Sequence, residues 1–138
     1  MYQSLPGIVS IHTVECSRLQ PQLMLRAMSK LPNAVFAPLT PRNHIGEPIC
    51  NTISEYLNGS RSEKTTLEFI SDEDFDANIP LAFVVKCVNG EAYLIGRKEH
   101  PYPIITITHT TGTTTSEASS YKIEVNFIAP KTLIPIKF

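Results

Sequence analysis

The strongest constraint on this fold is the series of short β-strand patterns in the last third of the chain, each separated from the next by a turn. The dipeptide Asn89-Gly90, which favours a tight hairpin turn, lies between the strand patterns Leu81–Val88 and Glu91–Gly96. Two more strand patterns, Ile104–Thr110 and Tyr121–Ile128, lie on either side of a Thr- and Ser-rich loop. Successive hairpins of this kind predict an all-β fold.

The hairpin around Asn89-Gly90 also carries a register prediction. A two-residue turn there would pair Cys87 with Ala92 and Val85 with Leu94. One face of the ribbon would then be wholly apolar and the other partly apolar. Such a ribbon is expected to lie in the centre of a sheet or to contact another molecule.

The first half of the chain mixes strand, helix and loop signals. Residues 8–16 are rich in β-branched side chains and predict the first strand. Apolar residues at helical spacing, with prolines at both ends, predict one short α-helix over about residues 21–31. Four prolines between residues 32 and 48 predict an irregular loop over 32–48.

The segment Ile49–Leu57 has an ambiguous pattern. Its apolar spacing fits a helix, but its Asn, Thr and Ser residues are poor helix formers. We predict a strand here, because residues 58–62 then form the loop of a hairpin over 49–70. With the hairpins over 81–96 and 104–128, the chain is expected to be one domain, 1–138. Its predicted fold is a sandwich or small barrel of about seven antiparallel strands with one short α-helix.

Composition limits the function classes. The 138 residues are 42% hydrophobic and 18% charged, with a net charge of −1, which does not fit a disordered chain. Nucleic-acid binding would need a surplus of Lys and Arg, which this sequence does not have. No apolar run is long enough to cross a bilayer. The first residues lack the pattern of a signal peptide.

The sequence contains no pattern that is typical of a catalytic or metal site. Cys16, Cys50 and Cys87 are odd in number and widely spaced, which favours buried, reduced thiols over disulfides. The acidic run 72–76 resembles the start of a calcium loop but lacks the required glycine and the final acidic residue. No nucleophile elbow, paired carboxylates or Gly-rich phosphate loop is present. We therefore expect no enzyme activity, no cofactor and no metal.

One family resemblance emerges from the order of these patterns. Six patterns follow one another along the chain: the Asn-Gly hairpin, Tyr93-Leu94-Ile95-Gly96, a charged corner, a Tyr102-Pro103 strand, the Thr-rich loop and a closing Thr132–Ile136 segment. Over residues 67–138 this order resembles small β-structured tail or neck proteins of bacteriophages and prophages. The resemblance implies a virion structural subunit that forms homo-oligomers and binds other virion proteins. It also implies a location in the virion and, during assembly, in the host cytoplasm.

Two segments are the candidate interface. The Thr- and Ser-rich loop would become ordered by binding a neighbouring subunit. The final segment, residues 133–138, is too apolar to stay exposed to solvent. The alternative for that final segment is an edge strand packed on its own domain. The candidate residues are Thr111, Gly112, Thr113, Thr114, Leu133, Ile134, Ile136 and Phe138. Two other functions stay open. One is a β-sandwich module that binds a peptide or glycan through Tyr56, Tyr93 and Tyr102, and the other is a small hydrolase.

Overall fold

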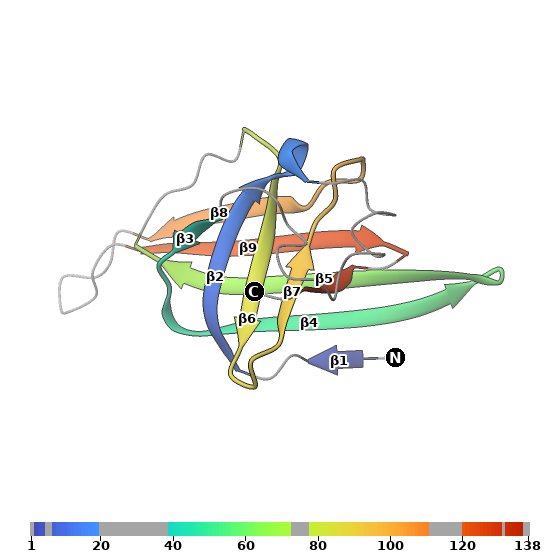
Figure 1. Ribbon diagram of the computed structural model, residues 1–138, viewed down its shortest axis with the longest axis horizontal. Coiled ribbons are helices and arrows are strands. Elements are labelled where there is room, and N and C mark those ends of the chain that lie inside the picture. The colour runs from blue at the N-terminus through green and yellow to red at the C-terminus, as the bar shows by residue number, and fades with distance from the viewer. Residues whose placement is uncertain are drawn as a thin grey trace.

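The computed structural model describes residues 2–4, 7–19, 39–72, 78–110, 120–130 and 132–136. These residues form ten strands and one short 3-10 turn, Cys16–Arg18 (Figure 1). The strands are β1 (Tyr2–Ser4), β2 (Ile8–Glu15), β3 (Thr40–Arg42), β4 (Ile45–Leu57), β5 (Ser60–Ser71), β6 (Leu81–Cys87), β7 (Ala92–Ile95), β8 (Ile104–Thr110), β9 (Ser120–Ala129) and β10 (Leu133–Ile136).

The strands form two antiparallel sheets of five strands each. The first sheet has the order β1-β4-β5-β9-β8, and the second has the order β10-β7-β6-β2-β3. In Figure 1 the strands of the second sheet run across those of the first, as in orthogonally packed sandwiches. The predicted all-β sandwich is therefore confirmed. The seven predicted strands correspond to β2 and β4–β9, and the structure adds the short strands β1, β3 and β10.

The prediction of an irregular loop over residues 32–48 is wrong for the part that the structure describes. Residues 40–42 form β3, and β4 already begins at Ile45. The prolines are tolerated because Pro41 lies on an edge strand and Pro48 lies where the register of β4 against β5 shifts, between Ile45 and Ile49. Residues 32–38 and the predicted helix over 21–31 lie outside the described residues.

The hairpin of β4 and β5 confirms the strand assignment of residues 49–57. Leu57 pairs with Ser60, so the turn is the dipeptide Asn58-Gly59 alone and not a loop over residues 58–62. Asn58 has φ 54° and Gly59 has φ 77°. Positive φ at both central residues is the type I′ geometry, which matches the twist of the flanking strands.

The second Asn-Gly hairpin differs, and the predicted register was wrong by one residue. Val85 pairs with Tyr93 and Val84 with Leu94. The Cys87 N–H donates to the Glu91 carbonyl at 2.8 Å and the Gly90 N–H donates to the Cys87 carbonyl at 3.0 Å. The loop therefore has three residues, and Gly90 at φ 87° supplies the left-handed position of the bulge that closes it.

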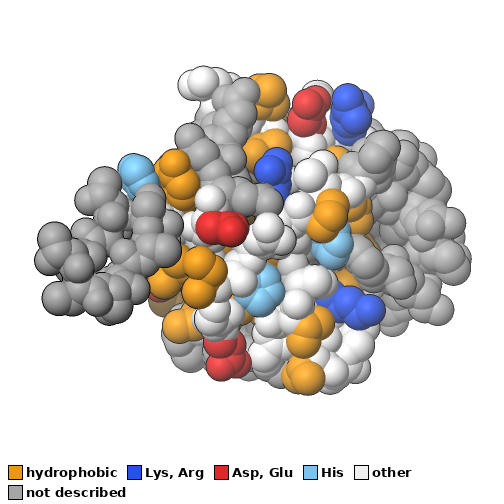
Figure 2. Space-filling view, turned by 90° about the vertical axis from the view of Figure 1, so that its left-hand side faces the viewer, with side chains coloured by type: hydrophobic (Ala, Val, Ile, Leu, Met, Phe, Trp, Pro, Cys, Tyr) orange, Lys and Arg blue, Asp and Glu red, His pale blue; other side chains and the backbone are white. Residues whose placement is uncertain are grey.

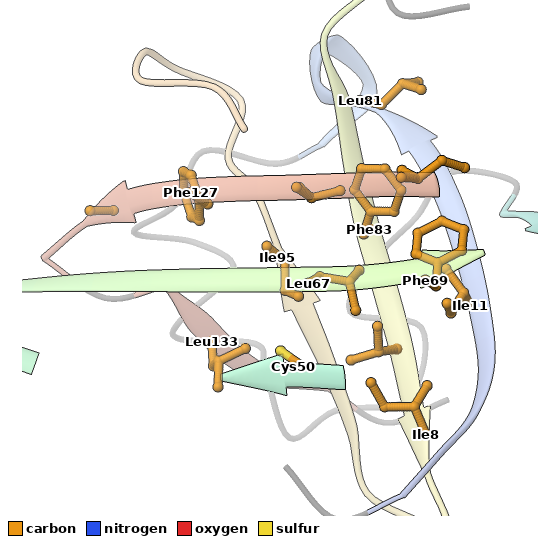
Figure 3. Close-up of a cluster of buried hydrophobic side chains, with 14 residues drawn as sticks. Ile8, Ile11, Cys50, Leu67, Phe69, Leu81, Phe83, Ile95, Phe127 and Leu133 are labelled. Atoms are coloured by element: carbon orange, nitrogen blue, oxygen red, sulfur yellow. The ribbon is translucent and has the colours of Figure 1, made fainter. Parts of the chain in front are cut away.

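The main core lies between the two sheets (Figure 3). Side chains of the first sheet, including Leu67, Phe69 and Phe127, face side chains of the second sheet, including Phe83 and Ile95. The rings of Phe69 and Phe83 meet edge to face, with centroids 6.3 Å apart. Strands β5, β6 and β9 contribute alternate residues to this core, as the pleat of a strand requires.

The second sheet is also buried on its other face. A second cluster contains Val14 of β2, Ala82 and Val84 of β6, and Leu94 of β7, and Tyr102 packs against it. Residues Leu81–Val85 are therefore all buried. The predicted central position of this ribbon is confirmed, because β6 lies between β7 and β2.

A buried polar cluster joins the first sheet to the residue that precedes β10. The carboxylate of Glu63 accepts hydrogen bonds from the Thr132 N–H at 3.0 Å and from Ser54 Oγ at 3.2 Å. Arg61 pairs with the same carboxylate. Thr65 Oγ1 donates to Thr132 Oγ1 at 2.6 Å. The buried charge of Glu63 is thus compensated, which its burial requires, and β10 is held at the edge of the second sheet.

The structure predicts a large cost for a side chain at Gly96. A Cβ there would lie 2.6 Å from the Ala82 Cβ, and the residue has φ 134°. We expect Gly96→Ala to lower the free energy of unfolding by about 3 kcal/mol or more, measured by urea unfolding. Gly59→Ala is the control, because φ is 77° but no atom lies within 4 Å; its expected cost is about 1 kcal/mol. Equal costs for the two variants would contradict this packing.

Candidate interaction surface

The first sheet has one face turned away from the second sheet, and we call it the outer face. Because side chains alternate along a strand, burial of Leu67 and Phe69 on β5 places Glu68 and Ile70 on the outer face. Six isoleucines of this face are 42–65% exposed. They are Ile45, Ile49 and Ile53 of β4, Ile70 of β5, Ile128 of β9 and Ile104 of β8.

Polar side chains separate these isoleucines. Lys64 pairs with Ile53 on one side and with Ile128 on the other. Ile49 pairs with Glu68, which pairs in turn with Glu124 of β9. The outer face therefore carries both signs of charge between large apolar side chains.

The two facing glutamates are the one like-charged pair among these rows, and such pairs destabilise a sheet. The amide of Asn126 donates to Glu124 Oε1 at 3.2 Å, and its carbonyl oxygen accepts from Thr66 Oγ1 at 3.0 Å. These contacts hold Glu124 along the sheet. A hollow of about 210 Å³ lies beside them, lined by Ile45, Ile49, Ile70 and Lys122 among others.

Two more hollows flank β3. One, of about 220 Å³, includes Thr13 and Arg42, whose Nε donates to Thr13 Oγ1 at 2.9 Å. The other, of about 330 Å³, includes His12, His44 and Asp72. His44 contacts the corner between the sheets, with Nδ1 3.0 Å from the Gly46 carbonyl oxygen. Burial, and then the charge of Lys86, lowers the pKa of His12.

These hollows do not gather the groups of a recognisable reaction centre. In the part of the chain that the structure describes, no three His, Cys, Asp or Glu side chains lie close enough to hold a metal ion. Figure 2 looks onto the left-hand side of Figure 1 and shows basic, acidic and histidine side chains scattered among hydrophobic ones. The outer face is therefore the better candidate site.

The sequence-predicted interface residues that the structure describes do not lie on the outer face. Leu133, Ile134 and Ile136 are buried, and β10 pairs with β7 of its own chain. This matches the alternative reading of the final segment, an edge strand packed on its own domain. Their side chains are core, so they are not accessible to a partner. Thr111, Gly112, Thr113, Thr114 and Phe138 lie outside the described residues.

The three tyrosines of the alternative binding module do not lie together. Tyr56 is 71% exposed near the end of the β4–β5 hairpin, with the Arg61 guanidinium 6.0 Å from its ring centroid. Tyr93 is half-buried, and its hydroxyl donates to Glu91 at 2.6 Å, which with burial raises its pKa to about 12. Tyr102 packs against the second cluster. They therefore form no shared aromatic platform for a ligand.

The three cysteines are free and buried, as predicted. Burial raises the pKa of Cys50 to about 12, with a further contribution from Cys87. Burial also raises the pKa of Cys16 to about 11, and the pKa of Cys87 lies above its ordinary value for the same reason, with Glu91 adding to it. All three thiols are protonated near neutral pH, which makes them poor nucleophiles.

Comparison with known proteins returned no match. No family model matches the chain, and neither a curated protein nor a solved structure does. Among the described residues, no helix is long and apolar enough to span a membrane. The roles of the residues on the outer face therefore rest on geometry and chemistry alone.

The thiol environment gives a direct prediction. At a pH near 8 an ordinary thiol ionises in part, whereas buried thiols with raised pKa values stay protonated and inaccessible. We expect none of Cys16, Cys50 and Cys87 to react with a chromogenic disulfide reagent in the folded protein, and all three to react in urea. A cysteine that reacts in the folded protein as fast as free cysteine would contradict the burial described here.

Proposed function

We propose that the chain is a non-enzymatic structural subunit of a phage or prophage virion, in the tail or the head–tail connector. It acts by binding copies of itself and other virion proteins. The observation that carries the proposal is the outer face, where six isoleucines are 42–65% exposed on a single sheet surface. Isolated exposed hydrophobic residues are common, but a set that shares one face is typical of a contact surface.

The energetics of the outer face favour association. Covering a half-exposed isoleucine gains about 1 kcal/mol from the hydrophobic effect. Six such side chains give several kcal/mol before the cost of association, enough to contribute substantially to a specific interface. The same face carries two lysines, Lys64 and Lys122, and three glutamates, Glu55, Glu68 and Glu124. A second copy therefore meets charges of both signs and not a field of one sign.

The virion assignment is supported by the resemblance of residues 67–138. That region supplies the central ribbon β6–β7, the outer-face strands β8 and β9, and the closing strand β10. Buried residues of this region, such as Leu94 and Ile95, belong to the core. The region that carries the resemblance therefore also forms much of the core that supports the outer face. A virion subunit needs this rigid support for its contacts. The proposed location is the virion, and the host cytoplasm during assembly.

The non-enzymatic part of the proposal is supported by the state of the candidate nucleophiles. The thiols are buried with raised pKa values. The buried carboxylate of Glu63 is occupied by Thr132 and Arg61, which fixes it in a structural role. The alternative binding module has weaker support, since its three tyrosines lie at separate places.

The proposal predicts that substitutions on the outer face weaken self-association. We expect the wild-type chain of 15.4 kDa to form assemblies whose mass rises with concentration, measured by sedimentation velocity and negative-stain imaging. The double variant Ile49→Lys/Ile128→Lys should give a lower mass at every concentration, because two charges then lie in the apolar contact. The variant should keep its circular dichroism spectrum.

Val88→Lys is the control for this experiment. Val88 is 68% exposed, but it lies in the β6–β7 loop and not on the outer face, so its substitution should leave the assemblies unchanged. A wild-type chain that stays monomeric at all concentrations and binds glycans or peptides would overturn the proposal in favour of the binding module.

A further inference from the structure

The two sheets have four edge strands, and three of them carry features that prevent pairing with another chain. The edges are β1 and β8 of the first sheet and β10 and β3 of the second. Both β1 and β3 have only three residues, and β3 contains Pro41. Pro135 lies within the four residues of β10. Short length and proline are common means of protecting an edge.

The remaining edge, β8, has none of these features. It spans seven residues, Ile104–Thr110, with no proline and no charged side chain. Its register against β9 is unbroken from the pair Ile104–Asn126 to the pair Thr110–Ser120, so no bulge interrupts it. Among the strands that the structure describes, β9 is its one neighbour. A long, regular, uncharged edge of this kind is a template for strand addition.

We propose that β8 pairs antiparallel with β8 of a second copy of the chain, so that two five-stranded sheets become one continuous ten-stranded sheet. The inference rests on the proposed function and deepens it, because it specifies one of the contacts through which the subunits associate.

The strand is self-complementary, which favours a second copy as the partner. With the two-fold axis at Ile107, all seven residues pair, and Thr106 lies opposite Thr108 of the second copy. Ile105 then lies opposite His109 of the second copy. The two residues of each pair are an even number of positions apart in the sequence, so their side chains lie on the same face of the joined sheet. Pairs of β-branched residues are favourable in sheets, and no charge faces its own copy.

The proposed pairing also extends the outer face. Ile104 on β8 is 65% exposed and belongs to that face, as do Thr106 and Thr108. Joining two copies along β8 places their outer faces side by side and doubles the apolar surface that is available to further subunits. Pairing along the β8 edge and contact through the outer face use different residues, so variants can test them separately.

Amide hydrogen exchange of the full-length wild-type chain, followed residue by residue, tests the pairing. In an edge strand, alternate N–H groups point toward β9 and the others point away. We expect the outward amides of β8 to exchange fast in dilute protein and at least tenfold more slowly in concentrated protein. Exchange of these amides that does not depend on concentration, while the mass rises, would overturn the inference.

Variants separate the edge from the outer face. The face variant Ile49→Lys/Ile128→Lys should still form dimers, measured by sedimentation velocity. Adding Thr106→Lys/Thr108→Lys to it should make it monomeric, because lysines on an edge strand oppose pairing. Adding Ser60→Lys/Ser62→Lys is the matched control. These two serines are exposed on the same face, in β5 and outside its pairing with β9, and the added charge is equal.

The outcomes distinguish this inference from the proposed function. Dimers that persist with lysines at 106 and 108, or a face variant that is monomeric although the wild type assembles, would overturn β8 pairing and leave the structural role in place. A wild type that stays monomeric at all concentrations would overturn β8 pairing, and if it also binds glycans or peptides it would overturn the proposed function as well.

Discussion

The period-two alternation of side chains in the first sheet is the constraint on which the rest of the structure depends. Its strands bury Leu67, Phe69, Val125 and Phe127 against the second sheet, and the intervening residues must then face outward. On β5 and β9 most of these outward residues are polar. On β4 they include isoleucines, which the body of the chain leaves exposed. The outer face is therefore a geometric consequence of the core.

Much of the fold is predictable from local patterns, and the errors have local causes. The alternation in residues 63–70 and 121–128 correctly predicts half-buried strands. Two Asn-Gly dipeptides predict two turns, but Asn58-Gly59 forms a two-residue turn and Asn89-Gly90 belongs to a three-residue loop. Both loop types accept glycine at a positive φ, so the dipeptide predicts the position of a turn and not its register.

The candidate surface was harder to predict than the fold. The final segment, Leu133–Ile136, is apolar because it fills the core, so its hydrophobicity alone did not distinguish a cis contact from a partner contact. The isoleucines of β4 resemble a helical pattern in the sequence. They become a surface only when register brings Ile53, Lys64 and Ile128 into one row across three strands. Such long-range pairing has no local signal.

The most direct test of the account follows the methyl groups of the isoleucines by nuclear magnetic resonance, with a soluble paramagnetic probe. As concentration rises, the outer-face isoleucines should lose relaxation enhancement, because a neighbouring subunit shields them. Buried Ile95 and Ile123, which are fully enclosed in the core, should show little enhancement at any concentration. Assemblies that form while the outer-face isoleucines stay fully accessible to the probe would contradict the claim that this face binds other subunits.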